Sequence, residues 1–469
     1  MAEAMMVNLL DYQDAETQQR ILLEATGVDY QTFEYSGVGF DYDALMRSPQ
    51  VEWADIVSTQ KNFKVGETPL FELSGVTQLV RHMSRPGHGA QILLKDEAAN
   101  ASGSFKARRA SLAVALAKRR GYAGVVAATS GNYGAAVASQ AAMQGLKCII
   151  LQEAYDSRGV GQPEILEKAR ACEAYGAEVV QLSVGPELFL TLLKVLDETG
   201  YFSASLYAPY SVLGVETLGF EIATQCREAY GRAPDSVVVS HAGGGNVTGT
   251  ARGLLRAGAV ETDVIAASVN LAGLHMASDG QFNRKSFTTS HTGFAMPFLD
   301  QPDRVDVPRN ACRPLRYLDR MVTVEQGDVF YATELLAQFD GLERGPAGNT
   351  ALAAAIPIAR ELPDTALVVV QESEYSGAGK NPYAQLAFAR DNGIEVSVGD
   401  PRKSSPGANI ILPANPEGMT VTDVDLRATR EKYVRRRSLH FDRSEADLVF
   451  LAEETRLPVN AVEEIVWSK

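Results

Sequence analysis

The chain has 469 residues, of which 45% are hydrophobic and 22% are charged, so it has the composition of an ordinary globular protein and is long enough for two or three domains. Its net charge of −14 argues against nucleic acid or an anionic membrane as a partner, and no stretch is apolar enough to span a bilayer. The N-terminus lacks the basic region of a signal peptide, and the four cysteines are too widely spaced for a disulfide framework or a metal site. We therefore expect a cytoplasmic protein with buried, reduced thiols and no metal ion.

The first 60 residues are expected to form a helical arm. Residues 15–25 have amphipathic spacing, and residues 40–45 have the acidic first turn of a helix. Nothing in this region indicates chemistry, so we expect it to pack on the body of the protein or on a partner.

The next informative feature is a lysine placed at the front of a helix. A short buried strand at 91–95 leads into Ser102–Lys106, which reads SGSFK, and a helix is expected at 107–120. The positive end of the helix dipole disfavours an ammonium group, and a neutral lysine can form a Schiff base. A lone lysine is more often a solvated surface residue, but the small residues before Lys106 allow a ligand to approach it closely.

Residues 107–205 are predicted to form a small α/β subdomain. Short apolar strands alternate here with helices, as in parallel sheets that carry helices on both faces. The expected strands are 125–128, 147–151 and 178–182, and the expected further helices are 135–144, 163–175 and 186–198.

A polar, glycine-rich turn follows the first of these strands. Its residues Thr129, Ser130, Gly131 and Asn132 offer backbone and side-chain donors at the carboxyl end of a strand, where open parallel sheets bind ligands. Asn132 is also a residue type that caps helices, and both roles can coexist.

A second glycine-rich turn lies between a strand at 236–240 and a helix that extends through Leu255. Its residues Gly243, Gly244, Gly245 and Asn246 predict a cradle of backbone N–H groups for a phosphate. Alternatives are a tight turn without a ligand and a dinucleotide site. The glycine spacing departs from the dinucleotide fingerprint by one residue, and the next strand, 264–269, is followed by an asparagine rather than an acid. His241 has no partner in sequence, so we expect a packed or hydrogen-bonding residue rather than a catalyst.

The second half of the chain contains a long polar segment, a last buried strand and a charged tail. Residues 270–316 are too long for an ordinary loop and are expected to be functional or partner-facing. Helices are expected at 328–339 and 351–361, and a strand at 367–371 runs into ESEYSGAGK. Residues 401–407 look like a linker to charged helical segments that reach Lys469. The run Arg435–Arg437 is interpreted as a solvated or partner-facing surface rather than a site for CoA.

The two motifs together carry a resemblance. SGSFK followed by TSGNYG resembles the fold type II pyridoxal-phosphate enzymes, the group of threonine synthase and the tryptophan synthase beta chain. Longer stretches, such as DEAANASGSFKARRAS and HAGGGNVTGTARGLL, resemble the pyridoxal-phosphate subunits of the 2-amino-4-oxopentanoate thiolases, which degrade ornithine. The resemblance extends from about residue 29 into the C-terminal segment.

The resemblance implies an architecture. The fold class would be α/β, with two α/β subdomains and the cofactor in the cleft between them. The expected divisions are an N-terminal arm at 1–60, a large subdomain from 61–106 and 206–400, a small subdomain at 107–205 and a helical extension at 401–469.

It also implies a role for each site residue. Lys106 would carry pyridoxal phosphate as a Schiff base and shuttle protons, and the loop Gly243–Asn246 would hold the phosphate. Asn132 would contact the 3′-oxygen of the cofactor, and Ser376 its ring nitrogen. Ser373 and the nearby acids are alternatives for the last role; these acids are Glu372 and Glu374. The substrate carboxylate would be held by Thr129, Ser130, Gly131 and Asn132.

The implied reaction is the cleavage of 2-amino-4-oxopentanoate by CoA, a cosubstrate, to acetyl-CoA and alanine. The partners implied are the amino-acid substrate, CoA, a smaller second subunit and a second copy of this chain in a homodimeric core. Three alternatives stay open at this stage. They are a single-chain enzyme of β- or γ-elimination or replacement acting on a hydroxy- or phospho-amino acid, a nicotinamide oxidoreductase using the glycine loop, and a binding module without activity.

Overall fold

The computed structural model describes residues 9, 11–129, 131–156, 159–161, 163–185, 187–271, 299–375, 382–440 and 444–467. Two of the expected site residues, Ser130 and Ser376, lie outside this described part of the chain.

The larger sheet has seven strands in the order β1-β2-β10-β7-β8-β9-β13. Its five central strands are mutually parallel, whereas the two edge strands are antiparallel to their neighbours. The edges are β1 (Leu70–Glu72) and β13 (Thr422–Asp423), and the central strands are β2 (Gln91–Asp96), β10 (Leu367–Glu372), β7 (Ser236–Ser240), β8 (Asp263–Val269) and β9 (Arg320–Val324). Runs of valine fill the centre because strands that are covered on both faces need apolar side chains on both.

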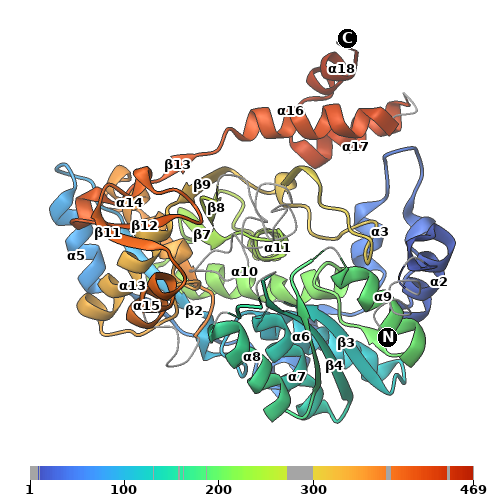
Figure 1. Cartoon of the computed structure of the whole chain (residues 1–469). Coiled ribbons are helices and arrows are strands. Elements are labelled where there is room, and N and C mark those ends of the chain that lie inside the picture. Colours follow the sequence, from blue (N-terminus) through green and yellow to red (C-terminus); the bar gives the residue numbers. More distant parts are fainter. Residues whose placement is uncertain are drawn as a thin grey trace.

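The smaller sheet is wholly parallel and has the order β5-β4-β3-β6. Its strands are β3 (Gly124–Thr129), β4 (Lys147–Tyr155), β5 (Glu178–Ser183) and β6 (Phe202–Ser203). Its helices are α6 (Lys106–Arg119), α7 (Asn132–Gln144), α8 (Pro163–Ala174) and α9 (Leu188–Thr199). All of these elements fall within residues 106–203, where the sequence predicts an α/β unit, and in Figure 1 they lie together below the rest of the body.

Two long helices of the larger unit pack unusually closely. They are α10 (Pro209–Tyr230) and α11 (Gly245–Arg256). A Cβ on Gly219 of α10 would lie 1.9 Å from the backbone oxygen of Thr250, and a Cβ on Gly253 of α11 would lie 1.9 Å from that of Glu216. Glycine inside a helix costs about 1 kcal/mol relative to alanine. Here glycine allows the backbones of α10 and α11 to touch. This contact fixes the position of the start of α11 and therefore of the glycine-rich turn.

The remaining helices cover the large sheet and form the two ends of the chain. Those of the large sheet are α5 (Ser74–Met83), α13 (Gln326–Asp340) and α14 (Thr350–Glu361), while α15 (Pro382–Asp391) packs against α13 in a separate small core. The N-terminal arm contains α2 (Ala15–Thr26), α3 (Tyr42–Arg47) and α4 (Trp53–Asn62), as its amphipathic spacing predicts.

The expectation of purely helical structure after the linker is wrong. Strand β12 (Asn409–Pro413) pairs with β11 (Glu395–Gly399), and β13 then joins the edge of the large sheet. The physical reason is burial, because Ile410 is fully buried in a small core with Phe330 of α13 and Leu386 of α15. Helices begin only at α16 (Leu426–Arg437) and continue as α17 (Glu445–Thr455) and α18 (Val459–Trp467), which stand above the body in Figure 1.

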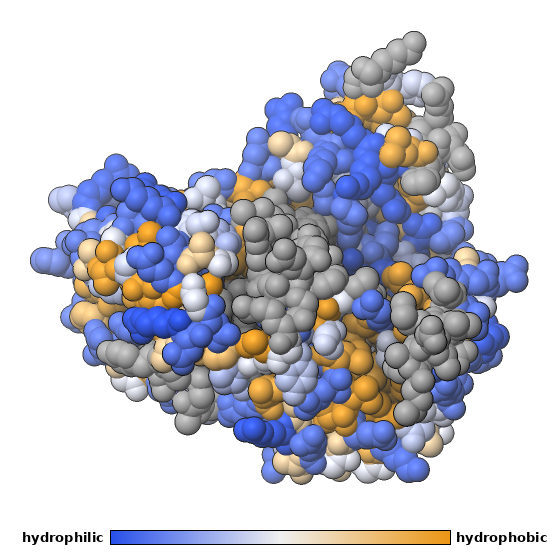
Figure 2. Space-filling model, in the orientation of Figure 1, coloured by the Kyte–Doolittle hydropathy of each residue, from blue (hydrophilic) through white to orange (hydrophobic). Residues whose placement is uncertain are grey.

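The surface of these last helices carries apolar side chains. Figure 2 shows hydrophobic colour on the lobe that they form, and its exposed residues include Leu439, Val449, Val459 and Trp467. Leu439 is 80% exposed. Among the described residues, no helix is long and apolar enough to cross a membrane.

Candidate active site

A cavity of about 430 Å³ lies at the carboxyl ends of strands from both sheets. Thr129 ends β3, Ser240 ends β7, Val269 ends β8, and Glu374 follows β10; all four line it. This is the position that the sequence predicts for a ligand, since the crevice outside the carboxyl ends of parallel strands is where such folds bind one.

Lys106 is the first residue of α6 and projects into this cavity. The loop before it is fastened to the chain after β10, because Phe105 donates its N–H to the Ser373 oxygen at 3.1 Å and Tyr375 donates to Gly103 at 2.8 Å. The Lys106 Nζ lies 4.5 Å from the centre of the Phe105 ring. Burial, with a contribution from the Arg109 cation, lowers the pKa of Lys106 to about 7. About half of the amine is therefore neutral at pH 7.

The glycine-rich turn lies on the same cavity. Gly243, Gly244, Gly245 and Asn246 all line it, and α11 begins at Gly245. Gly244 has a φ of +84°, a backbone conformation that glycine adopts without strain. The first N–H groups of a helix have no partner within the helix, so this end offers donors and a positive dipole to an anion.

Arg109 and Cys312 crowd this turn. A Cβ on Gly245 would lie 2.6 Å from Arg109 Nη2 and 2.7 Å from Cys312 Sγ. Arg109 donates to the Leu206 carbonyl at 3.0 Å and is held one turn after Lys106 on α6. Burial raises the pKa of the Cys312 thiol to about 11, although the neighbouring arginines and Lys106 act in the opposite direction. An arginine thus lies beside the predicted phosphate cradle, a position that sequence reasoning missed.

The Ser-Gly-Asn turn is built around Thr129. The Thr129 hydroxyl accepts N–H groups from Gly131 at 3.0 Å and from Gly134 at 3.1 Å, which shapes the start of α7. Asn132 is the first residue of that helix, and its amide donates to the Glu374 carboxylate. Within the described part of the chain its side chain makes no capping bond, and its other amide atom, Oδ1, is buried without a partner. Three of the four residues predicted for the substrate carboxylate therefore lie on the cavity, while Ser130 is outside the described chain.

Ser376, predicted to contact the ring nitrogen, lies outside the described residues, so the structure places only its alternatives. Ser373 and Glu374 line the cavity, whereas Glu372 lies beneath them and is fully buried. Burial, together with the charges of Glu374 and Asp96, raises the pKa of Glu372 well above its usual range. Glu372 Oε2 accepts the Glu374 N–H at 2.9 Å, so Glu372 supports the loop from below.

Several buried polar atoms around this cavity have no hydrogen-bond partner in the part of the chain that the structure describes. They are Ser104 Oγ, Tyr133 OH, Asn132 Oδ1, Ser240 Oγ, Asn246 Oδ1, Arg109 Nε and both ring nitrogens of His241. An unsatisfied buried polar atom costs about 1–3 kcal/mol, so such a group around one cavity indicates a polar ligand. An amine, an anion cradle and amide donors fit a phosphorylated aldehyde such as pyridoxal phosphate.

Burial lowers the pKa of His241 to about 4, so its ring is neutral. His241 is buried, as expected for a packed residue, although its ring nitrogens have no hydrogen-bond partner among the described residues.

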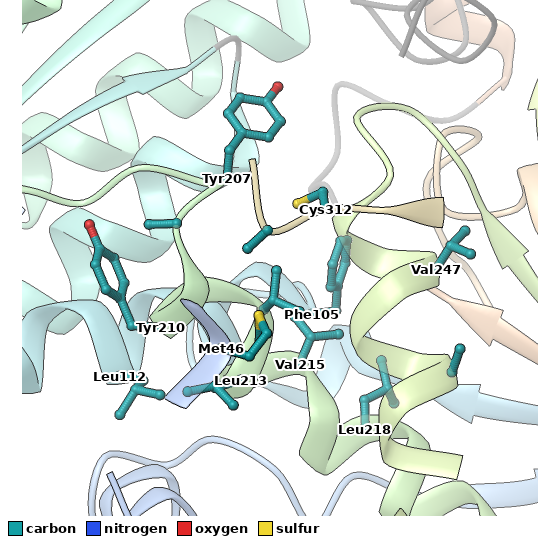
Figure 3. Packing of buried hydrophobic residues seen from close by; sticks show 14 of the residues in the cluster. Met46, Phe105, Leu112, Tyr207, Tyr210, Leu213, Val215, Leu218, Val247 and Cys312 are labelled. Carbon is teal, nitrogen blue, oxygen red and sulfur yellow. The ribbon is translucent and has the colours of Figure 1, made fainter. Parts of the chain in front are cut away.

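One wall of the site comes from a segment far away in sequence. Residues 299–316 bring Cys312 next to Phe105 and Tyr207, as Figure 3 shows. Ala311 donates its N–H to the Tyr207 oxygen at 2.9 Å, and Tyr42 of α3 donates to the Ala311 oxygen at 2.9 Å. The described end of the polar segment after residue 270 therefore borders the cavity, through Asp306.

The C-terminal helices hold this segment in place. Arg313 is 1% exposed and pairs with Glu454 of α17 at 3.2 Å and with Asp303 at 2.7 Å. Arg316 also pairs with Glu454, and Arg437 of α16 pairs with Asp303 at 3.3 Å. Arg437 belongs to the basic run 435–437, so at least one arginine of that run forms an ion pair within this chain instead of being simply solvated or facing a partner.

Comparisons with known proteins bear on this site. The family model described as "Pyridoxal-phosphate dependent enzyme" matches residues 62–373. The 2-amino-4-ketopentanoate thiolase beta subunit of Acetoanaerobium sticklandii is 59% identical over 442 residues, 94% of each chain. A protein of the same name from an unknown prokaryotic organism is 57% identical over 454 residues, 96% of each chain.

A solved structure supports the fold. The pyridoxal 5′-phosphate-dependent aspartate racemase superposes with a TM-score of 0.56 at 22% identity, over 71% of this chain and 98% of that one. The expected fold type II architecture is confirmed, and the dinucleotide alternative for the glycine-rich turn is not supported.

Proposed function

The chain belongs to the family of pyridoxal-phosphate-dependent enzymes, and on that premise we propose that it is the cofactor-binding subunit of a thiolase. Its reaction is the cleavage of 2-amino-4-ketopentanoate by CoA to acetyl-CoA and alanine, a step in ornithine degradation. The observation that carries the proposal is the convergence of the Lys106 amine and the glycine-rich turn on one cavity, in a chain 59% identical to a subunit bearing that name.

Pyridoxal phosphate, when bound, draws electrons from the Cα and Cβ of an amino acid attached to it. The backbone of Gly243–Asn246 and the Arg109 guanidinium are suited to its phosphate, because backbone N–H donors and a planar cation both bind such oxygens well. Lys106 is suited to hold its aldehyde. We assign Asn132 to its 3′-oxygen and Ser376 to its ring nitrogen.

Lys106 is also the group we assign to proton transfer at Cα. A pKa of about 7 is close to the ideal for a general base at neutral pH. Thr129, Ser130 and Gly131, together with Asn132, would hold the substrate carboxylate. Removal of electrons from Cβ makes the bond to the C4 carbonyl breakable, and CoA supplies the thiol that receives the acetyl group.

The second subunit and self-association belong to the same proposal. The similar proteins are named beta subunits, so a further subunit is expected for full activity. The exposed apolar side chains of α16–α18 are where we expect part of that contact, because they lie outside the matched family region. We further propose a homodimeric core and a cytoplasmic location, which suits four free cysteines.

The decisive experiment is an incubation of the chain, with and without its candidate second subunit, with 2-amino-4-oxopentanoate and CoA. Acetyl-CoA and alanine in equal amounts support the thiolase. The alternative is a single-chain elimination or replacement enzyme. It would be supported by release of ammonia or phosphate from serine, threonine or phosphohomoserine without cleavage dependent on CoA.

A further inference from the structure

One buried carboxylate on the cavity has no role in the assignments above. Asp306 is 1% exposed and lines the cavity from the segment that carries Cys312. Its Oδ2 accepts the Ser205 hydroxyl at 3.0 Å, whereas its Oδ1 is buried and has no hydrogen-bond partner among the described residues. One oxygen is thus fixed by the protein, and the other is left to meet something in the cavity.

Several polar groups surround Asp306. Arg304 of the same segment and Tyr207, next to Ser205, lie within its electrostatic reach, and Cys312 lies beyond Tyr207. Burial raises the pKa of Asp306 to about 6, although Ser205 and Arg304 act against this. The carboxylate therefore remains mainly ionised at neutral pH, yet binds a proton more readily than an exposed aspartate.

The identity of the missing partner follows from charge. An ionised carboxylate only accepts hydrogen bonds, so its partner must be a donor. The carboxylate of an amino-acid substrate would be repelled, and its amino group is needed at Lys106. At the reacting end of CoA the donor is the S–H group.

The cavity also has room for an apolar chain. Ile165, Leu188, Phe189 and Leu192 line its far part, beside α8 and α9. The methylene and methyl groups of the CoA thiol arm would pack against these side chains, and its S–H end could then reach the polar wall of the cavity.

We propose that Asp306 is the general base that accepts the thiol proton of CoA, with Ser205 as its positioning residue. The proposal rests on the thiolase function. The S–H proton moves to Oδ1 of Asp306, and the sulfur forms a bond to C4 while the electron pair of the C=O bond moves to oxygen. When that pair returns, the C3–C4 bond breaks, acetyl-CoA leaves, and C3 takes up one proton to give alanine. Atoms and charges balance without a further reactant.

The test separates two half-reactions of the loaded enzyme with its second subunit. Exchange of the Cα hydrogen of alanine with solvent deuterium needs Lys106 but no thiol. Asp306→Asn should leave this exchange within about two-fold of wild type. Its cleavage rate with CoA at pH 7 should fall at least 100-fold, the usual scale for loss of a general base. The matched control is Asp263→Asn, a carboxyl with a raised pKa outside the cavity, which should change neither rate.

The dependence of the cleavage rate on pH distinguishes the loss of a general base from a structural defect. Without a base, cleavage depends on free thiolate, so the Asp306→Asn rate should rise about ten-fold per pH unit up to the thiol pKa of about 8.5. The cleavage rate of the wild-type enzyme should change little with pH above pH 7. The groups facing Asp306 are the Ser205 hydroxyl, the phenols of Tyr30 and Tyr207 and the Arg304 guanidinium; burial raises the pKa of both phenols, that of Tyr207 to about 12, and lowers the pKa of Arg304.

The outcomes are distinct. An Asp306→Asn enzyme that cleaves as fast as wild type, or that loses exchange and cleavage equally, would overturn the role of Asp306 alone. A wild type that exchanges hydrogen but forms no acetyl-CoA would overturn the thiolase function, and this proposal with it. Ser205→Ala provides a second variant, expected to lower cleavage about ten-fold without affecting exchange; equal loss of both would also contradict the proposal.

Discussion

Glu454 connects the C-terminal helices to the active-site wall, and its removal should loosen that wall. The carboxylate is 3% exposed and accepts bonds from Arg313 and Arg316 and from the Tyr433 hydroxyl at 3.2 Å. Although burial alone would raise the pKa of Glu454, the two arginines lower it, so the group is ionised in the folded protein. Glu454→Gln keeps the shape of the side chain but removes its charge.

The free energy lost in Glu454→Gln depends on the interactions that the buried arginines keep. Breaking a buried ion pair costs about 3–5 kcal/mol, because the remaining charge is left buried and uncompensated. Arg313 keeps Asp303 at 2.7 Å and the Asn310 oxygen at 2.7 Å, so we expect the lower end, about 3 kcal/mol. That corresponds to about a 100-fold increase in local opening.

Hydrogen exchange followed by mass spectrometry measures this opening directly. Peptides covering 303–318 and 445–455 should exchange about 100-fold faster in Glu454→Gln, while peptides of the small sheet should not change. The matched control is Glu453→Gln. Glu453 is 60% exposed and lies 3.6 Å from Arg316, so its loss should cost less than about 1 kcal/mol. Equal exchange in the two variants would refute the argument that Glu454 secures this wall.

Three further predictions concern the cofactor and the partner. Because only the neutral amine attacks an aldehyde, the rate at which the apoenzyme gains its visible band should rise with pH up to about 7 and then level off. In Arg109→Gln the pH midpoint of this rate should move to higher pH, because the Arg109 cation lowers the pKa of Lys106; an unchanged midpoint would exclude that effect of Arg109. In Lys106→Ala the visible band should be absent. Gly245→Ala places a Cβ 2.6 Å from the arginine and should weaken cofactor binding at least ten-fold in a fluorescence titration, whereas Gly399→Ala, with its nearest neighbour at 3.4 Å, should not. Leu439→Asp on the exposed α16–α18 lobe should weaken capture of the second subunit without changing the melting temperature, and unchanged capture would locate that contact elsewhere.

The sequence alone determined the parts of the site that depend on local chemistry. Lys106 follows small residues and opens a helix, and the turn at Gly243–Asn246 joins a strand to a helix, so both positions could be inferred from a few neighbouring residues. Parallel strands bring such turns to one edge of a sheet, which is why their convergence could also be predicted. Arg109 was within reach of the same reasoning, since it lies three residues after the lysine on one helix face.

Only the tertiary structure decided which distant residues complete the site. Asp306 has no motif around it, and it reaches the cavity because its segment, which also carries Cys312, crosses to it and is tied there by Glu454. Tyr207 lines the cavity from the chain between β6 and α10. The strand at 409–413 escaped prediction for a similar reason: its charged surroundings suggest helix, while the burial of Ile410 against two other helices favours a strand. Side-chain partners contributed by remote parts of the chain leave no periodic or local pattern, so they emerge only when packing brings them together.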